Sequence, residues 1–187
     1  MGFIPSSSFP YIIIRPRTTK KWKLRLTPRE FQEWGTRKNK IGSFFEGASR
    51  GKPGAAGAGG VFISPRGKIE FRYSWGLGTK TNNQAKALAL FKGCQLALQQ
   101  GYFDIQFLVD SMLLINWIVH NTKPKNIRLS SLIERIILSL SKFHLMQVFH
   151  VLRSLNTEAN IEANKGVAQT HGKLLTYVPF EEFHPLP

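Results

Sequence analysis

The sequence predicts an α/β domain in which a mixed five-stranded sheet carries helices on its faces, preceded by a basic N-terminal arm. Three observations support this prediction. The chain has 187 residues, 42% of them hydrophobic, which is enough for one domain with its own core. Strand and helix patterns follow one another in the order β-β-β-α-β-α-α-β-α, an order that implies a mixed sheet. Residues 1–43 hold ten Lys and Arg against two Glu, so they contribute about half of the net charge of +15.

The pattern divides the chain into an arm at 1–40, a folded domain at 41–172 and a C-terminal tail at 173–187. Four prolines within the arm prevent one long helix there. Its segment "TPREFQEW", residues 27–34, predicts a short helix with Thr27 as the N-cap and Pro28 at the first helical position. Two arm tryptophans, Trp22 and Trp34, either stack on bases or dock the arm onto the domain.

The first part of the domain reads as three strands joined by turns. The apolar runs are "IGSFFEGAS" at 41–49, "GAGGVFIS" at 57–64 and "GKIEFRYSW" at 67–75. The connecting segments "RGKPGAA" and "PRG" are rich in the residues that form turns. Strands joined by short turns pair with their chain neighbours, so we expect an antiparallel meander.

The second part alternates between helical and strand periods. The helix that follows the meander is capped by Thr81 or Asn82 and ends at Gly101, and the last helix is capped by Asn156 or Thr157. The expected elements, in order, are helix 82–100, strand 104–110, helix 111–121, helix 127–144, strand 145–151 and helix 156–172. The tail at 173–187 ends in prolines and is assigned to no element.

The charge and cysteine content restrict the class of protein. A net charge of +15 points to a polyanionic partner, either a nucleic acid or an anionic membrane surface. No apolar run is long enough to span a membrane. Cys94 is the single cysteine, so no disulfide forms within the chain, and we expect an intracellular, reducing compartment. Residues 1–29 lack acidic residues, which leaves a mitochondrial or other organellar transit segment as an alternative to a phosphate-binding arm.

Four segments carry a family resemblance in their order and spacing. They are "FFEGASRGKPGAAGAGGVF", "SWGLGTKTNNQAKALALFKGCQLAL", "FLVDSMLLINWI" and "FHVLRSLNTEANIEANKG". Together they resemble the successive blocks of the type 1 ribonuclease H domain, above all the version carried by plant retrotransposon polyproteins and their domesticated relatives. The resemblance covers residues 41–172. It implies the ribonuclease H-like fold, which agrees with the element order, and a family that cleaves the RNA strand of RNA–DNA hybrids.

That family uses two Mg²⁺ or Mn²⁺ ions held by four carboxylates. The resemblance places these four positions on Glu46 in the first strand, Lys86 in the first long helix, Asp110 after the fourth strand and Asn160 in the last helix. Two carboxylates are therefore replaced, one by an ammonium and one by a carboxamide. Since Mg²⁺ requires oxygen ligands and their negative charge, we expect no metal cofactor here.

We expect the ammonium of Lys86 to take the place of a cation between Glu46 and Asp110, so that the two-metal chemistry is lost. One alternative stays open. Glu158 or Glu162 lies close to Asn160 in sequence and could replace it as a ligand. The protein would then be an active hybrid ribonuclease with an altered metal site, in which Glu46 and Asp110 remain ligands.

The binding residues are expected in three places. The glycine-rich loop "RGKPGAAGAGG" carries Arg50 and Lys52 and allows a backbone to approach a phosphate closely. The resemblance implies that the "TNNQ" segment contacts the minor groove and the 2′-hydroxyls of the RNA strand, and it comprises Thr81, Asn82, Asn83 and Gln84. The arm supplies a run of phosphate-binding cations, namely Arg15, Arg17, Lys20, Lys21, Lys23 and Arg25.

These features favour a nucleic-acid-binding pseudonuclease of retroelement origin, whose partner is an RNA–DNA hybrid or structured RNA. One alternative is the active ribonuclease just described. Another is a structural RNA-binding subunit of a ribonucleoprotein such as an organellar ribosome, whose arm would order on RNA. Random decay is disfavoured because the core pattern, caps and turns agree with one another and the loss is confined to the carboxylates.

Overall fold

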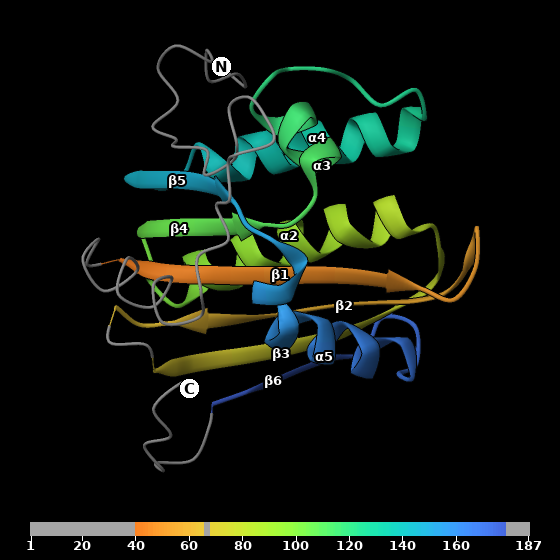
Figure 1. The fold of residues 1–187 in the computed structure, drawn as a ribbon, viewed down its shortest axis with the longest axis horizontal. Coiled ribbons are helices and arrows are strands. Elements are labelled where there is room, and N and C mark those ends of the chain that lie inside the picture. The colour runs from red at the N-terminus through yellow and green to blue at the C-terminus, as the bar shows by residue number, and fades with distance from the viewer. Residues whose placement is uncertain (1–39, 66–67, 179–187) are drawn as a thin grey trace.

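The computed structural model describes residues 40–65 and 68–178 (Figure 1). The first elements are β1 (Ile41–Ser49), β2 (Gly54–Ile63), β3 (Ile69–Lys80), α2 (Asn82–Gln99) and β4 (Asp104–Val109). They are followed by α3 (Met112–Ile118), α4 (Ile127–Leu140), β5 (Leu145–His150), the 3₁₀ turn η1 (Arg153–Leu155), α5 (Thr157–Val167) and β6 (Leu174–Tyr177). The predicted order of elements is confirmed. The basic run, the helix at 27–34, Trp22 and Trp34 lie outside the described residues.

The sheet has six strands in the order β5-β4-β1-β2-β3-β6, where five were predicted. The antiparallel meander of β1, β2 and β3 is confirmed, and β4 and β5 lie parallel to β1 on its other side. The sixth strand, β6, pairs antiparallel with β3, where Trp75 lies opposite Leu174. This strand falls in the segment predicted as a tail. Four residues are too few to show a strand period, so only its pairing with the edge of β3 defines it.

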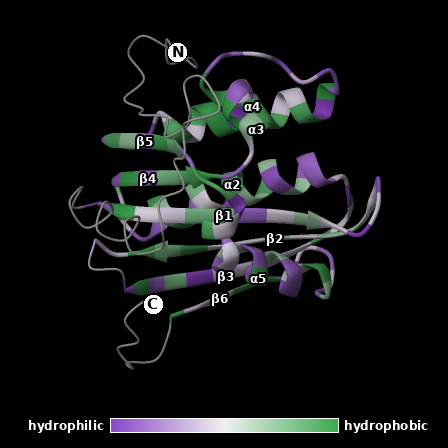
Figure 2. Ribbon diagram, in the orientation of Figure 1, coloured by the Kyte–Doolittle hydropathy of each residue, from purple (hydrophilic) through white to green (hydrophobic). Residues whose placement is uncertain are grey.

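Helices cover both faces of the sheet (Figure 1). On the rear face α2 and α4 pack over the larger core, which contains Phe45, Phe62 and Phe107. On the front face α5 packs against β1, β2 and β3. Strands β4 and β5 are largely hydrophobic in Figure 2, whereas the loop between α3 and α4 is hydrophilic. None of the described helices is long and apolar enough to cross a membrane.

The glycine-rich segment is mainly a strand: the strand predicted at 57–64 is confirmed as β2, Gly54–Ile63, and the expectation that the whole of "RGKPGAAGAGG" is a loop is corrected. Two of its glycines, Gly57 and Gly59, lie under α5. A Cβ atom added to Gly57 would lie 2.2 Å from the backbone nitrogen of Val167, and one on Gly59 would lie 2.5 Å from the carbonyl carbon of Glu162. These glycines therefore allow α5 to approach the sheet, not a phosphate. The exposed turn is limited to residues 50–53.

Candidate functional site

Strand register brings two carboxyl groups together. Strands β1 and β4 are parallel neighbours, and Phe44 lies beside Leu108. Continuing this register by two residues places Glu46 of β1 beside Asp110, which directly follows β4. Because side chains two residues apart in a strand point to the same face, both carboxyl groups lie on the face that α5 covers. The structure thus joins the two retained carboxylates of the sequence prediction.

A glycine allows the lysine to reach these carboxyl groups. A Cβ atom on Gly47 would lie 2.1 Å from the carbonyl carbon of Ala85 and 2.2 Å from the backbone nitrogen of Lys86. The first turn of α2 therefore packs directly on β1. The ammonium Nζ of Lys86 lies 3.6 Å from Glu46 Oε1 and 3.8 Å from Asp110 Oδ1. The predicted position of the ammonium, between the two carboxyl groups, is confirmed.

The electrostatics of this cluster are governed by burial. The side chains of Glu46 and Asp110 are 7% and 4% exposed. Burial, followed by the hydrogen bond and the negative charge of Asp110, raises the pKa of Glu46 to about 7. The positive charge of Lys86 lowers the pKa of Glu46 by a smaller amount. The backbone N–H of Gly47, which donates to Glu46 Oε1 at 2.9 Å, also lowers this pKa. At neutral pH Glu46 is therefore partly protonated, and the site is less negative than a simple count of charged side chains suggests.

Asn156 belongs to the site, although its sequence position indicated only a helix cap. It precedes α5 and makes no side-chain capping hydrogen bond. Its Nδ2 atom donates to the carbonyl oxygen of Phe45 at 2.9 Å and to Asp110 Oδ2 at 3.2 Å. The side chain is buried and joins the start of α5 to β1 and to the end of β4. Its position four residues before Asn160, one of the four positions that the family resemblance singles out, was the available signal.

The remaining positions offer no second set of ligands. Asn160 is exposed on α5. Glu158 Oε2 lies 2.8 Å from Arg72 Nη1, and Glu162 Oε1 lies 3.3 Å from the same atom. The buried Glu162 also accepts a hydrogen bond from the hydroxyl of Tyr177 in β6. Both glutamates are therefore paired with Arg72 of β3, which disfavours the alternative that either one replaces Asn160 as a ligand.

The donor set does not fit the two metal ions of the family. A cation between Glu46 and Asp110 would occupy the place of the Lys86 ammonium. Within residues 40–65 and 68–178, no group of three or more His, Cys, Asp and Glu side chains could hold a metal ion.

The "TNNQ" segment divides into two roles. Thr81 Oγ1 accepts a hydrogen bond from the backbone N–H of Gln84, and Gln84 Oε1 accepts one from the N–H of Thr81. This capping box begins α2, so the cap is Thr81 and not one of the asparagines. Asn82 Oδ1 accepts from the N–H of Ser49 at 2.9 Å and so ties the end of β1 to the start of α2.

That tie brings the predicted contact residues to one end of the sheet. Arg50 and Lys52 lie in the turn that follows Ser49, and both are exposed. Asn82 and Asn83 are exposed at the first turn of α2. Two cations and two amides from separate segments thus form one polar edge beside the carboxyl cluster.

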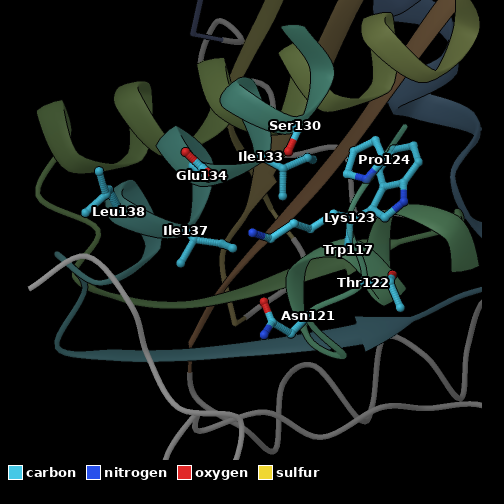
Figure 3. A pocket seen from close by; sticks show the side chains of 10 residues that line it. All are labelled: Trp117, Asn121, Thr122, Lys123, Pro124, Ser130, Ile133, Glu134, Ile137 and Leu138. Atoms are coloured by element: carbon cyan, nitrogen blue, oxygen red, sulfur yellow. The ribbon is translucent and has the colours of Figure 1, made fainter. Parts of the chain in front are cut away.

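A separate groove of about 470 Å³ lies between α3, α4 and the loop that joins them (Figure 3). Trp117, Ile133 and Ile137 contribute apolar walls, and Lys123 extends across the groove. The residues that line the groove come from α3, α4 and the loop between these helices. None of the predicted site residues is among them.

The family can now be stated from sequence comparison. The sequence model of the reverse transcriptase-like family matches residues 44–166. The chain belongs to this family of ribonuclease H-like domains. The matched segment contains the whole carboxyl cluster with Lys86 and Asn156, and also Asn160.

Individual members support the assignment. The ribonuclease HI of Halobacterium salinarum is 32% identical over 133 residues, which cover 70% of this chain and 66% of that protein. The chain therefore spans just under two thirds of the length of this relative. The crystal structure of ribonuclease H1 from the same archaeon has a TM-score of 0.67 at 30% identity and covers 70% of this chain and 99% of that one.

A third comparison concerns the fold alone. A ribonuclease H1 solved in complex with an RNA/DNA hybrid has a TM-score of 0.63 at 24% identity, over 69% of this chain and 97% of that one. The ribonuclease H-like fold predicted from the element order is thus shown for this member of the reverse transcriptase-like family.

Proposed function

We propose that this ribonuclease H-like domain binds RNA–DNA hybrids or structured RNA and has lost the two-metal cleavage of its family. The observation that carries the proposal is the position of the Lys86 ammonium, 3.6 Å from Glu46 and 3.8 Å from Asp110. At an effective dielectric constant of about 20, an ammonium at roughly 4 Å repels a divalent cation by on the order of 8 kcal/mol. At the same distance that repulsion cancels the attraction of one full carboxylate, and of the two carboxyl groups in the site Glu46 is partly protonated.

The polar edge formed by Arg50, Lys52, Asn82 and Asn83 supports the binding part of the proposal. Cations contact phosphates irrespective of sequence, and exposed amides both donate to and accept from a 2′-hydroxyl. None of these side chains depends on a metal ion for its position. The complex of a ribonuclease H1 with an RNA/DNA hybrid supports the choice of hybrid as the first substrate to test.

The origin of the domain is part of the same proposal. Membership of the reverse transcriptase-like family supports descent from the ribonuclease H domain of a retroelement polyprotein. Replacement of the carboxylates at Lys86 and Asn160, within a core that remains complete, supports retention of the fold for binding.

A paired assay on one labelled RNA–DNA hybrid tests the proposal. The full chain is compared with the variant Lys86→Glu/Asn160→Asp, with binding read by gel shift and cleavage measured in Mg²⁺ and in Mn²⁺. We expect the natural chain to bind without cleaving and the variant to cleave. Adding Asp110→Asn to the variant is the matched control, since it removes a retained ligand and should abolish the new cleavage.

Two results would contradict the proposal. Metal-dependent cleavage by the natural chain that disappears in Asp110→Asn would show that the site still holds metal. Absence of binding to both hybrid and structured RNA at low salt would remove the proposed role of the polar edge.

A further inference from the structure

One part of the front face of the sheet lies beyond α5. It is formed where β1, β4 and β5 begin, and we call it the front corner: Gly42, Phe44, Gln106, Leu108, Gln147 and Phe149. Register explains why they share a face, since Gly42 lies beside Gln106, which lies beside Gln147. In the next row Phe44 lies beside Leu108, which lies beside Phe149.

Helix α5 and the connection that precedes it pack on the second row of this corner. The connection from β5 to α5 crosses the front of β4 and β1 (Figure 1), and its Val151 and Leu155 pack with the row of Phe44, Leu108 and Phe149. Helix α5 itself packs on β1, β2 and β3. The first row lies about 7 Å further along the strands, at two residues of roughly 3.3 Å each.

Gln106 in the first row is nevertheless buried. Its exposed fraction is 1%, although its neighbour Gly42 has no side chain with which to cover it. Its Nε2 atom is buried without a hydrogen-bond partner. A buried amide donor without an acceptor is unfavourable, so a segment that covers Gln106 gains stability if it offers an oxygen atom.

From these observations we infer that the segment directly before β1, residues 27–39, docks on the front corner and covers Gln106. The chain enters the domain at this place. Lys40, the residue that joins the segment to β1, already lies across two strands and donates from Nζ to Gln147 Oε1 at 3.0 Å. Residues 27–39 are thus joined through Lys40 to the strand beside which they would dock.

The sequence of the segment suits this surface. In the helix predicted at 27–34, Phe31 and Trp34 are three residues apart and therefore lie on one side. The five residues 35–39 span up to about 17 Å when extended, enough to return to Gln106. Phe44, Leu108 and Phe149 are already buried in the second row, so two aromatic rings over the first row would extend this apolar cluster.

The C-terminal segment is a poorer occupant. Residues 179–187 follow β6, which is separated from β4 by β1, β2 and β3 in the strand order. Four strand spacings amount to about 19 Å, so this segment would have to cross β3, β2 and β1 before it reached Gln106, whereas residues 27–39 directly precede β1. A second copy of the chain remains the other occupant that the experiment distinguishes.

Docking also determines where the basic run of the arm leaves the domain. The run at residues 15–25 would then leave the domain at the end of the sheet where β1 starts. Arg50 and Lys52 lie at the opposite end, because they follow the last residue of β1. Cations at both ends of the front face would then contact one extended polyanion. This consequence rests on the proposed function, whereas the docking does not.

The experiment uses the full chain with methyl groups labelled for NMR. Ile63, the last residue of β2, lies beside Gly42 and packs against the same cluster as Leu108. In Phe31→Ala/Trp34→Ala we expect the methyl resonances of Leu108 and Ile63 to shift, because two aromatic rings are lost from their surroundings. We also expect increased binding of a hydrophobic dye and a lower urea midpoint. Trp22→Ala, which lies outside residues 27–39, is the matched control and should leave all three readouts unchanged.

Other outcomes would overturn the inference. Unchanged Leu108 and Ile63 resonances in the double variant would exclude residues 27–39 as the occupant. If deletion of residues 179–187 shifts these resonances instead, the C-terminal segment is the occupant. If the shifts depend on protein concentration and accompany dimer formation in ultracentrifugation, the occupant is a second copy. Hybrid binding is not a readout here, so failure of this inference is distinguishable from failure of the proposed function.

Discussion

Asn156 Nδ2 lies 3.2 Å from Asp110 Oδ2, while the ammonium of Lys86 lies 3.8 Å from Asp110 Oδ1. The two oxygen atoms of one carboxylate are thus each faced by a nitrogen of a different helical segment. In a two-metal nuclease such oxygens face cations from solution. Here the chain supplies its own partners, so the cluster holds β1, β4, α2 and α5 together.

We expect Asn156→Ala to destabilise the fold by about 1–3 kcal/mol, since it leaves the carbonyl of Phe45 and one oxygen of Asp110 without a buried partner. Urea denaturation followed by circular dichroism measures this change. Asn160→Ala, on the exposed side of the same helix, is the matched control and should change the free energy of unfolding by less than about 0.5 kcal/mol. Equal effects of the two substitutions would argue against the tie between α5 and Asp110.

The raised pKa of Glu46 predicts a pH-dependent stability. Between the ordinary value of 4.5 and about 7, the folded protein holds more protons on Glu46 than the unfolded chain does. The free energy of unfolding therefore falls as the pH rises through this window, by on the order of 3 kcal/mol in total, and this contribution is constant above it.

Glu46→Gln should flatten that part of the profile, because the amide does not titrate. Urea midpoints between pH 4.5 and 8 measure the difference, with Glu134→Gln on the exposed side of α4 as the control. Parallel profiles for the natural chain and Glu46→Gln would show that Glu46 does not titrate in this window.

Gly47 is predicted to be essential for the position of α2. A Cβ atom there would meet the backbone of Ala85 at 2.1 Å, which no rotamer change relieves. We expect Gly47→Ala to cost about 3 kcal/mol or more. Gly172→Ala provides the comparison, because Gly172 has a φ of 86° but nothing lies within 4 Å of an added Cβ. This substitution should therefore cost only the backbone strain of the left-handed conformation, about 1–2 kcal/mol. Thermal denaturation of both variants separates the clash from the strain.

Arg50→Ala/Lys52→Ala should weaken binding to a hybrid without changing stability. Loss of two phosphate contacts lowers the slope of log affinity against log salt by about 2. Titrations at several salt concentrations measure the slope. Lys142→Ala is the control, since this exposed lysine precedes β5 at the opposite end of the sheet from the turn at 50–53. An unchanged slope in the double variant would place the nucleic acid elsewhere.

Local sequence patterns are sufficient to predict the order of the helices and strands up to α5. The β1 pattern "IGSFFEGAS" and the helix from Asn82 follow from local periods and caps, which depend on neighbouring residues alone. The family resemblance also predicts, without a structure, that Lys86 and Asn160 stand where the family has carboxylates. The position of the ammonium followed from charge, since two buried carboxyl groups need a cation between them.

Only the tertiary structure decided which distant residues meet. The tie of Asn156 to Asp110, the binding of Glu158 and Glu162 to Arg72, and the pairing of β6 with β3 all join segments far apart in sequence. Gly57 and Gly59 of β2 illustrate the same limit, because the sequence predicted a strand over them but not that α5 would pack directly on them. Such contacts depend on strand register and helix approach, which are properties of the packed chain rather than of any local pattern.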